Sequence, residues 1–299
     1  MQHTPVLLQE VIKFLDPKPG EFIIDGTVDG GGHSAKIFSK ILPDGKLLGI
    51  DWDEQLLPIA QKKILAEVKS EKLKVESLIL VQGNYADLPK ILKENKLPKA
   101  DGLLLDLGFS SEQLESGRGF SFLKDEPLRM TYDPNRKPVR ELLENIDAKT
   151  LAKTIFELSG EKFAMRIAIA IKEYQKRKSI ETSGELRKII MDAVPKNYEH
   201  GRIDPATRTF QALRIWANDE LGNLEKTLDH LRDILKIGAR VVIVSFHSLE
   251  DRLVKQKFRE MEKEGRLKIL TKKPIMPSAV EAAANPRSRS AKLRAALMT

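Results

Sequence analysis

The fold class is indicated first by one glycine-rich segment, Asp25-Gly26-Thr27-Val28-Asp29-Gly30-Gly31-Gly32-His33. It follows a short apolar run at residues 21–25 and precedes a helix-like stretch at 34–42 with apolar residues on one side. Glycines at such a junction let the backbone approach a ligand and expose N–H groups at a helix start. A strand, a glycine-rich turn and a helix in this order indicate a ligand-binding α/β sheet.

The same alternation continues along the chain. Further strands are expected at residues 46–51, 78–81 and 100–108, and helices at 55–69 and 88–94. The strand segments are continuous apolar runs, which is typical of parallel strands buried on both faces. Strand–helix alternation predicts a doubly wound sheet of the α/β class.

The pattern changes near residue 115. Residues 115–137 are loop-like, and from 139 to 194 the apolar residues recur at helical spacing with no strand run between them. The α/β pattern resumes with a strand at 239–246, a helix to about Glu264 and a possible last strand at 267–270, after which the tail is expected to be extended or loop-like. We therefore expect a discontinuous domain, 1–114 and 215–299, with a helical insertion at 115–214.

The acidic residues beside the turn indicate a nucleoside cofactor. Asp51 ends the second strand about twenty residues after Gly30, where a carboxylate can accept both hydroxyls of a ribose. The glycines also satisfy the dinucleotide pattern G-x-G-x-x-A, which allows a nicotinamide-dependent oxidoreductase. An acid just before the turn, here Asp25, is more typical of S-adenosylmethionine sites, because it can face a cationic methionine end.

Other polar residues at strand ends are expected to complete this site. Asp106 follows a buried apolar strand and emerges at the edge where open α/β sheets bind ligands. Asn84 and Tyr85 follow the third strand, where Tyr85 can stack on an adenine or simply pack at the rim.

Charge is distributed unevenly over the 299 residues. The net charge is +8, yet residues 252–299 carry +9 and the rest of the chain carries −1. A basic stretch of this kind suits a polyanion such as nucleic acid, although a solvated basic helix without a partner would have the same composition.

The chain contains no cysteine, which excludes disulfides, thiolate metal sites and a cysteine nucleophile. We expect no metal cofactor. No apolar run is long enough to span a membrane and the first residues do not have the pattern of a secretory signal, so we expect a cytoplasmic protein. The sequence does not indicate an oligomeric state.

The chain resembles the bacterial small-subunit ribosomal RNA cytosine-N4 methyltransferases of the MraW or RsmH type. The matching segments lie in the same order over nearly the whole chain. They are His3–Leu8, Asp25–Ser34, Asp101–Ser111, Arg118–Phe122, Pro205–Glu220, Ser245–Arg252 and Asn285–Arg294. One position departs from the family pattern, because Arg129 stands where the family usually has an acidic residue, and no role is assigned to it.

The resemblance implies a Rossmann-like S-adenosylmethionine-dependent methyltransferase acting on ribosomal RNA, within the small ribosomal subunit, with the helical insertion recognising the substrate. It also implies the residues that hold the cofactor. These are Gly31, Gly32, His33, Asp51, Tyr85, Asp106 and Gln113.

Methylation of a cytosine amine needs a group that accepts the amine hydrogens, because the nitrogen lone pair is delocalised into the ring. Asp106 is the candidate, with Phe109 stacking on the base or packing in the core, and His247 contacting the substrate or accepting a proton. Helix capping is the alternative explanation for the segment around His247. A non-catalytic RNA-binding assembly factor would have the same fold. Methylation at C5 of a pyrimidine normally needs a cysteine, which this chain lacks.

Overall fold

The computed structural model describes residues 5–68, 77–108 and 111–299. The chain divides into two compact units, a sheet-containing unit of residues 1–110 and 221–299 and a helical unit of residues 111–220. Among the described residues, no helix is both long and apolar enough to cross a membrane.

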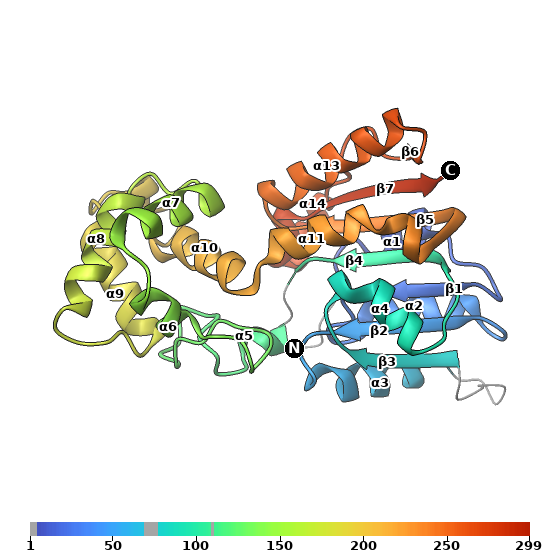
Figure 1. Ribbon diagram of the computed structural model, residues 1–299, viewed down its shortest axis with the longest axis horizontal. Helices are drawn as coiled ribbons and strands as arrows, with labels where there is room; N and C mark the ends of the chain where they lie inside the picture. Colours follow the sequence, from blue (N-terminus) through green and yellow to red (C-terminus); the bar gives the residue numbers. More distant parts are fainter. Residues whose placement is uncertain (1–4, 69–76, 109–110) are drawn as a thin grey trace. The chain divides into compact units, whose positions relative to one another are not determined.

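The first unit is built on a seven-stranded sheet in the order β3-β2-β1-β4-β5-β7-β6 (Figure 1). Strands β1 to β5 are parallel, and β7 is antiparallel to both of its neighbours. The predicted α/β class is therefore confirmed. The strands are β1 (Phe22–Asp25), β2 (Lys46–Asp51), β3 (Leu78–Gln82), β4 (Ala100–Asp106), β5 (Leu235–Ser245), β6 (Leu267–Ile269) and β7 (Lys292–Met298).

Helices cover both faces of this sheet. On one face, the buried core of the sheet contacts α4 (Leu88–Glu94), α11 (Glu220–Asp229), α12 (Leu231–Ile234) and α13 (Ser248–Lys263). On the other face, it contacts α1 (Leu8–Leu15), α2 (Gly32–Ile41) and α3 (Leu56–Glu67). Because apolar residues on both sides of each central strand are buried, the strands read as continuous apolar runs in the sequence.

The tail after residue 271, expected to be extended or loop-like, is extended in its last part and joins the sheet there. It contains α14 (Ala279–Ala284), the short 3₁₀ turn η4 (Pro286–Ser290) and β7, which lies between β5 and β6. The sequence did not predict a strand of the sheet here, because Lys292 and Arg294 interrupt the apolar pattern. Arg294 is nevertheless buried, with its guanidinium paired to Asp251 at 2.7 Å.

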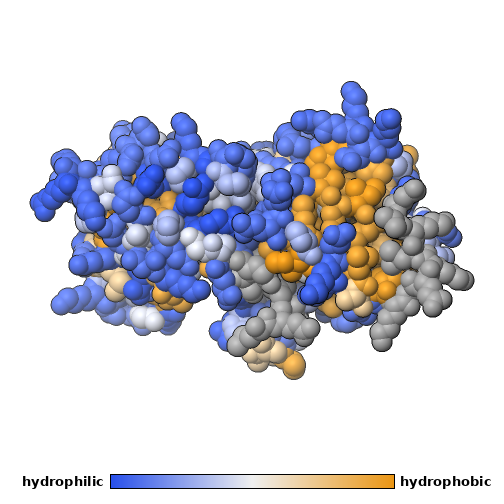
Figure 2. Space-filling view, turned by 90° about the horizontal axis from the view of Figure 1, so that it is seen from below, coloured by the Kyte–Doolittle hydropathy of each residue, from blue (hydrophilic) through white to orange (hydrophobic). Residues whose placement is uncertain are grey.

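The helical unit has a core of its own. Apolar residues from all of its longer helices, together with Phe120, Leu128 and Met130 of the preceding loop, form one buried cluster. In Figure 2 the visible face of this unit is mostly hydrophilic, whereas apolar surface gathers on the sheet-containing unit. The helices are α5 (Ser111–Leu114), α6 (Val139–Glu144), α7 (Ala148–Ser159), α8 (Ala164–Gln175), α9 (Ser183–Ala193) and α10 (Ala206–Asn218), with the 3₁₀ turn η3 (Tyr198–Gly201).

Candidate active site

The glycine-rich turn joins β1 to α2 and is fixed to both neighbouring strands. Gly26 N–H donates to the carbonyl of Leu104 on β4, and Val28 N–H donates to the carbonyl of Ile50 on β2, each at 2.9 Å. Gly31 lies in the left-handed region with φ 78°, and a Cβ there would lie 2.9 Å from Cα of Ala60. The turn therefore requires glycine at this position for both conformation and space.

Asp51 holds the turn from the end of β2. Its Oδ2 accepts a hydrogen bond from Asp29 N–H and its Oδ1 accepts one from Asp53 N–H, both at 2.8 Å. The ribose role of Asp51 stays a prediction, and the structure shows that its carboxylate orders the turn.

Asp25 lies beneath the turn and is completely buried. Its Oδ2 accepts from the Ser34 hydroxyl at 2.6 Å and its Oδ1 accepts from Thr27 N–H at 3.2 Å. Burial raises the pKa of Asp25 to about 7, and the nearby charge of Asp51 acts in the same direction. The structure thus places Asp25 as a support under the turn, and not as a side chain exposed to a cationic ligand.

Asp106 ends β4 and is held by Thr27, whose hydroxyl accepts the Asp106 N–H at 2.6 Å. Burial, together with the nearby charges of Asp25 and Glu250, raises the pKa of Asp106 to about 7. Within the described part of the chain, its Oδ1 is buried and has no hydrogen-bond partner. Since buried carboxylate oxygens are normally paired, an unpartnered one at this edge of the sheet points to a ligand or substrate donor.

His33 lies against Asp106, with its Nδ1 3.4 Å from Oδ2 of the carboxyl group. The other ring nitrogen, Nε2, is 2.9 Å from the carbonyl oxygen of Val6. Because a carbonyl only accepts, Nε2 carries a hydrogen, and Nδ1 of the neutral ring then presents a lone pair to the carboxyl group. A single proton, carried either by Nδ1 of His33 or by Oδ2 of Asp106, lets one of these atoms donate to the other.

The segment that positions His33 is itself held by the C-terminal part of the chain. Leu7 N–H donates to Oε1 of Glu281 on α14 at 2.7 Å. Gly32 packs against the same segment, because a Cβ on Gly32 would lie 2.4 Å from Cγ of Pro5. The role of Glu281 was not predicted, since nothing in the sequence links a residue of the tail to residue 7.

Asn84 and Tyr85 follow β3 as expected. Asn84 is buried, and its amide caps the short turn at Ala86 and donates to Asn223 at 2.8 Å. Its hydrogen-bonding groups are therefore used within the protein. Tyr85 is half-buried and packs beside Gly26. Stacking of Tyr85 on an adenine stays a prediction.

The structure does not test the roles of two further predicted residues. Gln113 is buried in α5 and belongs to the helical unit. Phe109 lies outside the described residues. Their roles in cofactor binding and base stacking stay predictions.

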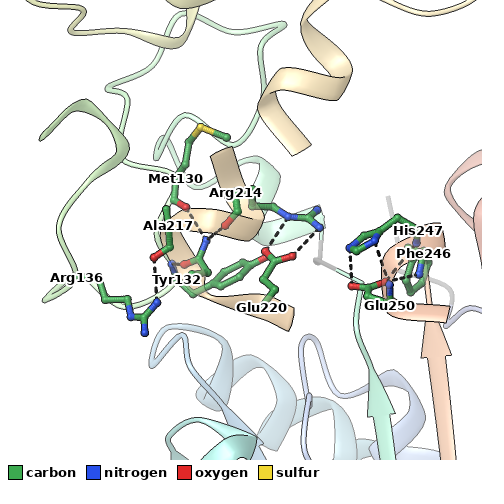
Figure 3. Close-up of polar contacts among 10 residues, drawn as sticks. Met130, Tyr132, Arg136, Arg214, Ala217, Glu220, Phe246, His247 and Glu250 are labelled. Carbon is green, nitrogen blue, oxygen red and sulfur yellow. Dashed lines mark hydrogen bonds and ion pairs between the residues drawn. The ribbon is translucent and has the colours of Figure 1, made fainter. Parts of the chain in front are cut away.

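His247 is the N-cap of α13, and its ring faces Glu250 (Figure 3). Glu250 N–H donates to Nδ1 at 3.4 Å, and Nε2 lies 3.0 Å from Oε1 of Glu250. The other carboxylate oxygen of Glu250 accepts from the N–H groups of Phe246 and His247. The capping alternative thus describes this motif well, with His247 itself as the cap, and a role of His247 in proton transfer stays a prediction.

Polar contacts within the helical unit also order the end of α10, which sequence reasoning did not find. Glu220 accepts two hydrogen bonds from Arg214, at 2.9 and 3.0 Å, and one from the Tyr132 hydroxyl at 3.2 Å (Figure 3). The Asn218 amide bonds to Met130 and to the backbone of Tyr132. These contacts could have been suspected from the polar residues of the segment Pro205–Glu220. The family resemblance includes this segment but assigns no role to its residues.

A Rossmann-like sheet with a glycine turn after β1 and buried acids at the ends of β1, β2 and β4 defines an α/β protein with a nucleoside-cofactor site at this edge of the sheet. The MraW methylase family matches residues 1–299, and the chain belongs to that family. This assignment decides against the nicotinamide-dependent oxidoreductase that the glycine pattern also allowed.

Similar proteins from several bacteria carry the name ribosomal RNA small subunit methyltransferase H. The protein of Syntrophus aciditrophicus is 43% identical over 311 residues, covering 98% of this chain and 96% of that protein. The protein of Desulfosudis oleivorans is 41% identical over 313 residues, covering 99% and 98%. The protein of Persephonella marina is 42% identical over 297 residues, covering 99% of each.

Proposed function

We propose that this methyltransferase transfers a methyl group from S-adenosylmethionine to the exocyclic N4 amine of a cytosine in small-subunit ribosomal RNA. The family and the names of the relatives support methylation of ribosomal RNA. The observation that carries the site is the unpartnered, buried Oδ1 of Asp106 at the carboxyl end of β4. An exocyclic amine is a hydrogen donor that this oxygen can accept.

The residues around the turn fit the cofactor. At Gly31 and Gly32 the packing is so close that a side chain has no room, so only backbone lines the start of α2. The N–H groups of this backbone are available to a ligand. Asp51, at the carboxyl end of β2, is the residue that we assign to the ribose hydroxyls. When bound, S-adenosylmethionine supplies a methyl group on a positively charged sulfur.

Asp106 performs the step that the amine requires. Accepting a hydrogen of the amine raises the electron density on nitrogen, which forms its bond to the methyl carbon as the carbon–sulfur bond breaks. The displaced proton passes to Asp106, whose pKa of about 7 makes it a competent acceptor at neutral pH. His33 holds the other oxygen of the carboxyl group and so fixes which oxygen faces the substrate.

The remaining parts of the proposal concern the substrate. We assign recognition of the RNA to the helical unit together with the basic surface of the sheet-containing unit, and we place the reaction in the cytoplasm, on the small ribosomal subunit.

A labelling experiment tests the function. Small ribosomal subunits that lack the modification, and naked ribosomal RNA, are incubated with the protein and tritiated S-adenosylmethionine, and the nucleosides are then separated. We expect labelled N4-methylcytidine from the subunits. A label on another nucleoside would overturn the assignment to cytosine. Binding of the cofactor without label on either substrate would favour the assembly factor.

A further inference from the structure

The structure sorts the basic residues of the tail into paired and unpaired groups. Lys257 contacts both Glu225 and Asp229 at 2.9 Å, and Arg294 contacts Asp251 at 2.7 Å. These cations are neutralised by carboxylates of the same unit. The net charge of +9 over residues 252–299 therefore overstates what this region offers to a partner.

Three of the unpaired cations line one groove. Lys255 and Arg259 lie on α13, and Lys272 lies on the segment that follows β6. In the part of the chain that the structure describes, none of them forms an ion pair. Lys255 and Arg259 are four residues apart and so lie on the same face of the helix, about 6 Å apart along its axis. The groove has a volume of about 310 Å³ and lies wholly within the sheet-containing unit.

The floor of the groove is fixed by β7. Thr271 Oγ1 accepts from Ala295 N–H at 2.9 Å, and the buried Arg294 adds its paired guanidinium. Glu262 is the acidic side chain in the lining, and its Oε1 accepts from Ile269 N–H at 2.8 Å. The floor is therefore held by strand contacts, while the free ammonium and guanidinium groups remain available at the rim.

We propose that this groove binds the phosphodiester backbone of the ribosomal RNA substrate. That the bound polyanion is ribosomal RNA rests on the proposed function. Lysine binds phosphate oxygens through a compact positive charge. Arginine binds them through the parallel N–H donors of its planar guanidinium group. The aromatic residue of the lining, Phe258, is buried and cannot stack on a base. The groove thus holds RNA by its phosphates and contributes to position and affinity without reading the sequence.

The groove also lies on an element that begins at the site. Helix α13 starts after His247, at the carboxyl end of β5, and Lys255 is two turns further along. Phosphates held in the groove would therefore restrain RNA beside the edge of the sheet where Asp106 lies.

The test replaces the three cations together, as K255Q/R259Q/K272Q. Affinity for a fragment of small-subunit ribosomal RNA is measured by fluorescence anisotropy at several salt concentrations. Each phosphate contact contributes about 0.7 to 0.9 to the slope of log affinity against log salt. We expect the slope of the triple variant to be less steep by about two to three. The Kd for S-adenosylmethionine and the melting temperature should match those of the unsubstituted protein.

A matched variant controls for the loss of charge. Lys40, Lys46 and Lys93 are exposed and lie at the opposite edge of the sheet, where the helices of this unit end and the parallel strands begin. The variant K40Q/K46Q/K93Q should keep the slope of the unsubstituted protein. An unchanged slope in K255Q/R259Q/K272Q, or an equal change in the control, would overturn the proposal.

The two proposals can fail separately. If the unsubstituted protein labels no cytosine in ribosomal subunits, the proposed function fails whatever the binding slopes are. If it labels cytosine and the groove variant binds RNA with the same slope as the unsubstituted protein, only the groove fails. A higher KM for subunits at unchanged kcat in the groove variant would support binding of substrate and not chemistry.

Discussion

Replacement of Asp51 by asparagine tests how the site is organised. The two carboxylate oxygens accept N–H groups from opposite directions, from Asp29 in the glycine turn and from Asp53 after β2. Asparagine has one oxygen and one NH₂ group, so in either orientation one backbone N–H faces another donor. Asp51→Asn therefore removes one charge-assisted hydrogen bond and disturbs one wall of the cofactor site with almost no change in volume.

The magnitude follows from the bond that is lost. Hydrogen bonds to charged groups contribute about 1.5–3 kcal/mol, and about 1.4 kcal/mol corresponds to a tenfold change in binding. If the turn must be ordered to bind the cofactor, the Kd for S-adenosylmethionine should increase by roughly 10- to 150-fold. Loss of the negative charge toward the ribose hydroxyls acts in the same direction.

Isothermal titration with S-adenosylmethionine and with its demethylated product measures the effect. Asp101→Asn is a matched control, because Asp101 also accepts a backbone N–H, from Phe22 at 2.9 Å, but at the start of β4. We expect the control to lower the melting temperature and leave the Kd unchanged. A Kd for Asp51→Asn within twofold of the unsubstituted protein would refute the role of Asp51.

Three other substitutions test neighbouring features. Gly32→Ala introduces a Cβ only 2.4 Å from Cγ of Pro5, and such overpacking costs about 1–3 kcal/mol. We therefore expect a lower melting temperature and weaker cofactor binding. A variant that melts like the unsubstituted protein would contradict this. Asp106→Asn should reduce kcat by about 10²- to 10⁴-fold. Because burial raises the pKa of Asp106 to about 7 and the ionised form is the acceptor, the rate of the unsubstituted protein should rise with pH through that value, and a flat profile would exclude the role. The raised pKa also means that the folded state favours the neutral form of Asp106. The contribution of this group to stability is therefore complete below its unfolded pKa near 4 and is lost as the pH rises toward 7. Over that range the stability of Asp106→Asn relative to the unsubstituted protein should increase. Tyr198→Phe removes the hydroxyl that donates to the buried carboxylate of Glu161, and urea unfolding should show a loss of about 1–3 kcal/mol, whereas an unchanged midpoint would show that Glu161 finds another donor.

The parallel part of the sheet was predictable from the sequence because its strands are buried on both faces. The apolar run before Asp106 predicted β4, and the one before Asp25 predicted β1. The residues that end these strands were identified for the same reason, since a polar residue after an apolar run marks the edge at which ligands bind.

The rest depended on contacts between distant residues. Strand β7 was missed because Arg294 looks exposed in the sequence, and its burial depends on the carboxylate of Asp251. The support of His33 by Val6, and of Leu7 by Glu281, is likewise invisible without the fold. The residue pattern identified which side chains carry the chemistry, but not which neighbours set their proton positions and pKa values.

The position of β7 in the sheet has a consequence for synthesis of the protein. It is inserted between β5 and β6, although it follows both in the chain. While the chain is being made, β6 has no strand to pair with, and one edge of β5 stays open until residues 292–298 have emerged from the ribosome. An open edge invites pairing with other chains. The nascent protein is therefore expected to depend on late closure of the sheet, and protection of that edge by a chaperone would improve its yield.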